Sequence, residues 1–129
     1  MSNWCVLKAD IKNPNREVLK KALEELANEL GVELREKTMI YGYSMERLAD
    51  FGLMIRGTYG NGIGVSISED GIEVFGDTHG MRINIHELRE KINQLYIKHS
   101  VIEALNELGY VYEVVKDREN IVIDVVVST

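Results

Sequence analysis

The segment from Gly57 to Gly64, GTYGNGIG, has the composition of a loop that binds a ligand. Glycines let backbone N–H groups approach an anion closely because they carry no Cβ. A phosphate loop ends at the N-terminus of a helix, however, whereas this segment leads into an alternating strand pattern over residues 63–67. We therefore predict a hairpin loop here, and an anion-binding loop is the alternative.

The tripeptide Asp77-Thr78-His79 places a carboxylate and an imidazole two residues apart. Such a pair can exchange protons with a substrate or contribute to a metal site. A metal needs three or four converging ligands, and the sequence offers no others at a recognised spacing. We predict an exposed polar turn with no catalytic residue, no metal and no cofactor. The alternative is a small-ligand or anion site composed of Arg56, Gly60, Gly62, Asp77 and His79.

Aromatic side chains are the third group with a potential function. Tyr41, Tyr43 and Tyr59 together with Trp4 form either an exposed patch for protein contact or a core layer that covers the sheet. Both interpretations stay open. His99 lies on an apolar helical stripe, where we expect a hydrogen-bonded core imidazole.

Length and composition indicate the number of domains, the compartment and the class of partner. The 129 residues predict one domain over residues 1–129, and the single cysteine, Cys5, favours a reducing cytoplasm. A net charge of −6 and a pI near 5.1 disfavour nucleic acid as a partner. We find no secretory leader and no run of 18 apolar residues, so we expect a cytoplasmic protein that does not insert into membranes.

The first half of the chain alternates between strands and one helix. Residues 4–11 predict a strand, and Asn13-Pro14 predicts the start of a helix whose leucine stripe ends at Gly31. Residues 32–43 predict one long or interrupted strand. Residues 44–50 fit either a turn of helix or an ordered loop, and extended structure resumes over residues 53–56.

The second half adds a hairpin, a helix and two further strands. Strands at residues 63–67 and 72–75 flank a turn that ends at Gly71, and a helix begins at Asn84 and ends at Gly109. Its apolar face changes near His99-Ser100, so it either breaks there or buries two faces. Residues 110–115 and 121–127 are strands, and the last is so rich in β-branched residues that we expect it to be central or covered on both faces.

The order β-α-β-β-β-β-α-β-β predicts an α+β fold with a mostly antiparallel sheet and two main helices on one face. Several short motifs recur along the chain in the succession Ala49-Asp50, Ile55-Arg56, Ile63-Gly64, Asp70-Gly71, Asp77 and Ile92-x-Gln94-x-Tyr96. In these motifs the chain resembles the Ycf35 family, known as DUF1257, whose members are small proteins of plastids, cyanobacteria and other prokaryotes without an established activity. The resemblance supports the fold and implies no reaction, cofactor or catalytic residue.

These observations favour a non-enzymatic module that binds another protein, because catalytic motifs are lacking and a strand-rich fold has edges that a partner can extend. A homodimer stays open. A small-ligand or anion-binding protein that uses the Gly57 to Gly64 loop is the second hypothesis. An enzyme would need titratable groups with perturbed pKa values in one cleft.

Overall fold

The computed structural model describes residues 3–118 and 120–126. Its main sheet has five antiparallel strands in the order β1-β5-β4-β3-β2, so β1 and β2 form its two edges. The strands are β1 (Trp4–Ala9), β2 (Leu34–Tyr41), β3 (Glu46–Leu53), β4 (Ile63–Ser68) and β5 (Gly71–Asp77). The predicted α+β fold with its mostly antiparallel sheet is confirmed.

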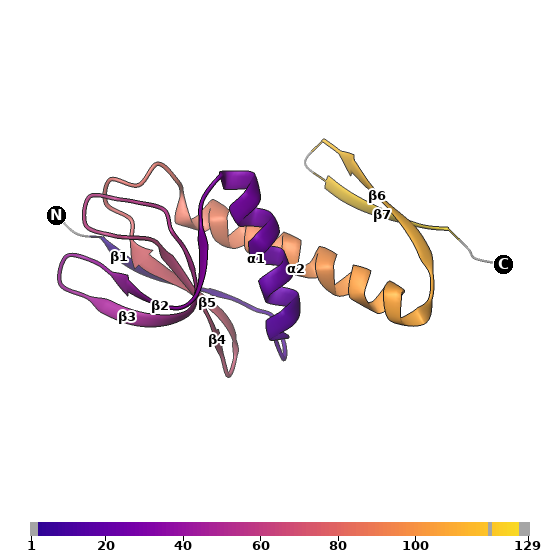
Figure 1. The fold of residues 1–129 in the computed structure, drawn as a ribbon, viewed down its shortest axis with the longest axis horizontal. Helices are drawn as coiled ribbons and strands as arrows, with labels where there is room; N and C mark the ends of the chain where they lie inside the picture. Colours follow the sequence, from indigo (N-terminus) through magenta and orange to yellow (C-terminus); the bar gives the residue numbers. More distant parts are fainter. Residues whose placement is uncertain (1–2, 119, 127–129) are drawn as a thin grey trace.

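Two helices, α1 (Arg16–Leu30) and α2 (Ile85–Leu108), pack against the sheet and each other (Figure 1). Each ends at a glycine in the left-handed conformation, as predicted for Gly31 and Gly109. Asn84 caps α2 by accepting the N–H groups of His86 and Glu87. The α1 helix begins later than predicted, because Asn15 and not Asn13 is its cap. The core contains the buried faces of both helices and of the sheet: Leu19, Leu23, Leu26, Phe51, Leu53, Ile63, Val65, Ile72, Val74, Ile92 and Leu95.

The strand β3 corrects the prediction for residues 44–56. The chain is already extended at Glu46, where it pairs with Tyr41, and the strand ends at Leu53. Asp50 holds β3 beside β4: its carboxylate accepts the N–H of Ile67, and its own N–H donates to the hydroxyl of Ser66. These long-range contacts override the helical propensity of residues 44–50.

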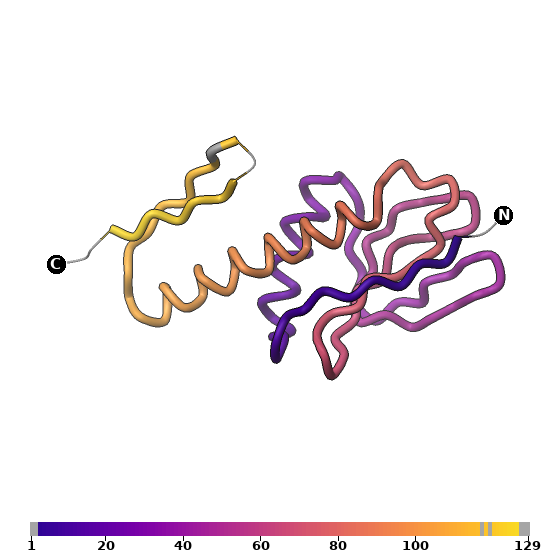
Figure 2. Tube along the Cα trace, turned by 180° about the vertical axis from the view of Figure 1, so that it is seen from behind, coloured from indigo at the N-terminus to yellow at the C-terminus, as the bar shows by residue number. Residues whose placement is uncertain are grey.

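The C-terminal part of the chain differs most from expectation. The α2 helix is continuous, but its buried residues, Ile85, Leu88, Ile92, Leu95 and Tyr96, all lie in its first half. Beyond it, β6 (Val111–Asp117) and β7 (Asn120–Val126) form a separate two-stranded antiparallel sheet. Figures 1 and 2 show this hairpin at the far end of α2, away from the main sheet. The prediction that the last strand is central or covered on both faces is therefore wrong.

Candidate functional site

The segment from Ile97 to Val126, which we call the arm, is the least buried part of the fold. Every side chain of the arm whose exposure the structure describes is at least partly exposed to solvent. Most of the large hydrophobic side chains that are exposed in the described chain also belong to it: Ile97, Val101, Leu108, Tyr110, Val111, Val114, Val115, Val122, Val125 and Val126. Exposed apolar surface on this scale is typical of an interaction site.

The β6–β7 hairpin has two faces, because side chains alternate along each strand. The inner face carries Tyr112, Val114, Lys116, Ile121, Ile123 and Val125. Of these, Ile121 and Ile123 line a cavity of about 350 Å³ whose other wall contains Ile97 and Val101 of α2. The inner face is thus directed towards the helix, and its Ile121 packs against the hydrophobic core beside this cavity.

The outer face of the hairpin points away from α2. Val111 lies opposite Val126, and Val115 lies opposite Val122. All four valines are at least 40% exposed. Between these two valine pairs, Glu113 lies directly opposite Asp124. The outer face is therefore a band of valines with two carboxylates at its centre.

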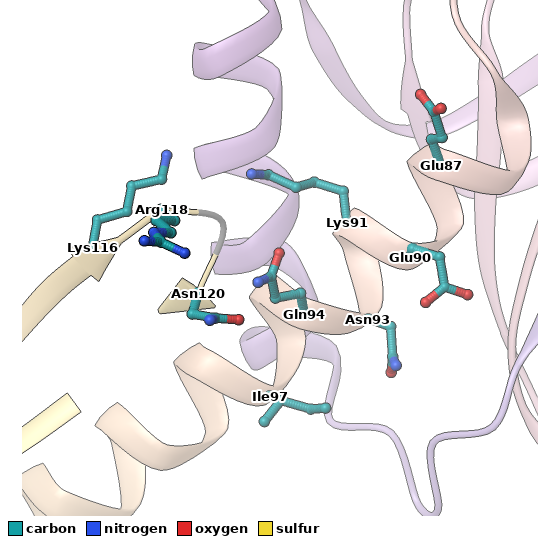
Figure 3. A pocket seen from close by; sticks show the side chains of 9 residues that line it. All are labelled: Glu87, Glu90, Lys91, Asn93, Gln94, Ile97, Lys116, Arg118 and Asn120. Carbon is teal, nitrogen blue, oxygen red and sulfur yellow. The ribbon is translucent and has the colours of Figure 1, made fainter. Parts of the chain in front are cut away.

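A larger hollow lies between the hairpin turn and α2. It has a volume of about 770 Å³, and cationic side chains approach it from both sides. Figure 3 shows Lys116 and Arg118 on the hairpin and Lys91 on α2. Lys91 also pairs with Glu29 at 3.3 Å, and Glu87 and Glu90 line the same hollow. Because its charges are mixed, the hollow has no clear preference for an anion.

The arm is anchored where α2 crosses α1. Glu25 Oε1 lies 2.9 Å from Lys98 Nζ and 2.9 Å from His99 Nε2. Burial raises the pKa of the Glu25 carboxyl, but hydrogen bonds from Lys98 and His99 outweigh burial and hold this pKa below its ordinary value. The predicted hydrogen bond of His99 is confirmed, but its imidazole is only half-buried and does not belong to the hydrophobic core.

The prediction of an exposed polar turn is wrong for Asp77, which is completely buried. Its Oδ1 atom accepts the N–H groups of Asn3 and His79, and its Oδ2 atom accepts that of Tyr43. Burial raises the pKa of this carboxyl, but the hydrogen bonds from the three backbone donors lower it by more, so the pKa lies below its ordinary value. The carboxylate joins the N-terminus, the β2–β3 turn and the segment after β5.

The glycine loop, Gly57 to Gly64, lies beside the backbone of Asp77 and His79, so the structure brings two parts of the predicted site together. The N–H of Thr58 donates to the carbonyl of His79 at 2.8 Å, and the rings of Tyr59 and His79 stack with centroids 5.5 Å apart. A Cβ at Gly60 would lie 2.7 Å from the carbonyl oxygen of Asp77. The glycine therefore permits close packing between two backbone segments.

The other two predicted site residues have different surroundings. A Cβ at Gly62 would lie 2.6 Å from the carbonyl oxygen of Leu53, so this glycine packs against β3. Arg56 is exposed. Across residues 3–118 and 120–126, no group of three or more His, Cys, Asp and Glu side chains is arranged to hold a metal ion.

The aromatic residues divide between the two interpretations offered above. Trp4 is partly buried against Phe75, with ring centroids 6.1 Å apart, in a small second cluster with Ile40 and Ala49. Tyr43 is exposed and contacts the edge of Tyr59 at 4.9 Å. Trp4 thus belongs to the core layer, whereas Tyr43 belongs to the surface.

The outer face of the hairpin was missed by the sequence-based prediction. Its signal was present, because Glu113 lies two residues from Val111 and Val115, and Asp124 lies two residues from Val122 and Val126. A strand face that carries a carboxylate among its apolar residues is seldom buried, because removing an unpaired charge from water is costly. Among the helices that the structure describes, none has the length and apolarity needed to cross a membrane.

Comparison with known proteins identifies a family. A family model described as a protein of unknown function (DUF1257) matches residues 26–126. No curated protein and no solved structure matches the chain. The match covers most of the chain, including the main sheet from β2 onwards, α2 and the hairpin. The chain belongs to this family, which confirms the resemblance noted in its sequence.

Proposed function

We propose that this member of the DUF1257 family is a protein-interaction module and that its arm is the binding element. The observation that carries the proposal is the outer face of the hairpin, with four exposed valines on a two-stranded sheet. Isolated hairpins of two strands are marginally stable in water and gain stability from a packed face. A bound protein supplies that packing.

The position of the arm supports the same function. It extends from the body of the protein, which comprises the main sheet, α1 and the first half of α2, so a partner can reach the arm without displacing the core (Figure 2). The anchor formed by Glu25, Lys98 and His99 fixes the start of the arm on α1. The body then acts as a scaffold that presents the hairpin.

The experiment is affinity capture from the native lysate with three forms of the full chain. Wild-type protein is expected to retain a specific companion, and the double variant V115T/V122T is expected to lose it. Threonine keeps the β-branched shape and the strand propensity of valine but places a hydroxyl on the outer face. Leu48→Thr is the matched control, because Leu48 is 62% exposed but lies on β3.

Two outcomes would contradict the proposal. One is a companion that V115T/V122T retains as well as wild type does. The other is the loss of the companion from Leu48→Thr alone. Circular dichroism and amide hydrogen exchange on each variant establish that the hairpin is still formed.

A second candidate function, small-ligand or anion binding, is favoured by the contact between the glycine loop and the segment after β5. The Tyr59–His79 stack is its main element, with the exposed Arg56 as the cationic group and Asp77 as the acceptor that holds the backbone of His79. Titration with inorganic phosphate, followed by NMR chemical shifts, tests it. Saturable shifts confined to residues 56–62 and 77–80 and lost in Arg56→Gln are expected, and unsaturable or dispersed shifts would contradict it.

A further inference from the structure

We infer that the outer face of the β6–β7 hairpin binds a segment of another protein that presents a lysine or arginine between apolar side chains. This inference rests on the proposed function and adds to it the chemistry of the partner. Its basis is the pairing of Glu113 with Asp124 in the middle of the valine band.

The first step concerns the two carboxylates. Residues directly opposite each other in an antiparallel pair have Cβ atoms about 4.5–5.5 Å apart, and like charges in this position destabilise the sheet. Both residues are exposed, and neither forms an ion pair with any other residue that the structure describes. The cation of β6, Lys116, belongs to the inner face, where Ile121 lies opposite it.

The second step concerns the group that can relieve the repulsion between these two carboxylates. A single cation placed between the carboxylates is attracted by both of them. The guanidinium of arginine can donate to two carboxylates at once, and the ammonium of lysine has three donors. The flanking valines exclude water once a partner covers them, which strengthens the attraction by lowering the local dielectric constant.

The third step concerns the residues on either side of that cation. Val111 and Val126 form one exposed pair, and Val115 and Val122 form the other, so apolar surface lies on both sides of the charges along the strands. A partner that buries both pairs therefore needs apolar side chains before and after its basic residue.

A second copy of this chain does not meet these requirements on this face. A twofold dimer brings identical surface patches together, so it would place Glu113 and Asp124 against the same two residues of the other copy. Four carboxylates would then be enclosed between valines without a cation, and like charges at an interface oppose association. The charges thus select a basic partner and disfavour a symmetric dimer through the outer face.

The test is selection from a library of random displayed peptides on the immobilised full chain. Peptides retained by wild type are expected to contain a lysine or arginine with apolar residues on both sides. Each selected peptide should bind the double variant E113Q/D124N at least about tenfold more weakly, since a charge pair buried at an interface contributes on this scale. Replacing the basic residue of the peptide by glutamine should have a similar effect.

Further measurements separate this inference from the proposed function. If V115T/V122T abolishes peptide binding whereas E113Q/D124N does not, the interaction module stands and the inference about a basic partner is overturned. If neither variant affects binding, both fail. Dimerisation of the wild type in analytical ultracentrifugation that V115T/V122T abolishes would also overturn the inference. Removing the like-charge pair should make the hairpin amides exchange more slowly, so weaker peptide binding to E113Q/D124N cannot be attributed to unfolding.

Discussion

His99 Nε2 lies 2.9 Å from Glu25 Oε1, so a hydrogen bond joins the middle of α2 to α1 at the start of the arm. Lys98 Nζ binds the same carboxylate, at 2.9 Å from Oε1 and 3.0 Å from Oε2. One carboxylate on α1 therefore holds two consecutive residues of α2. It does so just beyond Leu95 and Tyr96, the last buried residues of that helix.

Replacing Glu25 by glutamine should lower the free energy of unfolding at pH 7 by less than about 1 kcal/mol, because the carboxylate is partly exposed and solvent weakens its contacts. The lowered pKa means that this stabilisation is present above the ordinary value of 4.5 and is lost as the pH falls through the pKa of the folded protein. Urea denaturation at pH 7 and at low pH measures the difference. Glu103→Gln, which removes an exposed pair with Lys21, is the control, and an equal loss in both variants would contradict the assignment.

Asp77→Asn should destabilise the protein more strongly. The substitution removes the charge that accepts three backbone N–H groups in a fully buried position, and hydrogen bonds to a charged group contribute about 1.5–3 kcal/mol each. We expect a loss of roughly 1.5–3 kcal/mol at pH 7 in guanidinium denaturation, since the amide oxygen retains part of the bonding. Asp70→Asn, in the exposed β4–β5 turn, should change stability by less than about 0.5 kcal/mol.

The stabilisation that Asp77 provides depends on pH. The pKa of its carboxyl is lowered in the folded protein, so its contribution to the free energy of unfolding is complete above the ordinary pKa of 3.8. That contribution is lost as the pH falls through the pKa of the folded protein. The gap in stability between wild type and Asp77→Asn should therefore narrow below pH 3.8. A gap that is the same at pH 7 and in strong acid would show that the charge is not the cause.

Much of this fold follows from local sequence signals. The Leu19 and Leu23 stripe, the cap at Asn84 and the terminal glycines Gly31 and Gly109 predicted both helices, since these signals act within a few residues. The strand from Glu46 was missed because its stability comes from pairing with β2 and from Asp50, whose bonds to Ser66 and Ile67 join β3 to β4. Local propensity contains no information about such contacts.

The candidate sites were also predicted only in part. The sequence drew attention to Asp77, but it could not show that backbone N–H groups from distant segments donate hydrogen bonds to its carboxylate. The β-branched residues of β7 predicted a strand correctly. Burial of that strand would need elements packed on both of its faces, and in the described structure β7 pairs only with β6 and leaves its valines exposed. The carboxylates Glu113 and Asp124, each two residues from valines of the same face, were the better indicator of exposure, because an unpaired charge is rarely buried.

Tyr96 connects α2 to the start of α1. The backbone N–H of Asn15, the cap of α1, donates to the hydroxyl oxygen of Tyr96 at 2.7 Å. Tyr96→Phe leaves that donor without its partner in a part-buried position, so we expect the free energy of unfolding to fall by about 1 kcal/mol. Tyr110→Phe removes a hydroxyl from a side chain that is 45% exposed and should have almost no effect. Thermal unfolding of the two variants in parallel provides the comparison, and equal melting temperatures would count against this role of Tyr96.

The stability of the hairpin itself should respond to its charges before any partner is added. Glu113→Thr removes one member of the like-charge pair with Asp124 and introduces a residue with higher strand propensity. The hairpin should gain about 0.2–1 kcal/mol, the range of cross-strand interactions. Amide hydrogen exchange is the suitable measurement, because the arm can open without unfolding the body.

Lys116→Thr is the control. It introduces the same residue on the same strand but removes a charge that lies opposite Ile121, so the hairpin gains only the higher strand propensity. Slower exchange at residues 111–117 and 120–126 in Glu113→Thr than in Lys116→Thr is the expected result, and equal protection would mean that the two carboxylates do not repel each other in the folded hairpin.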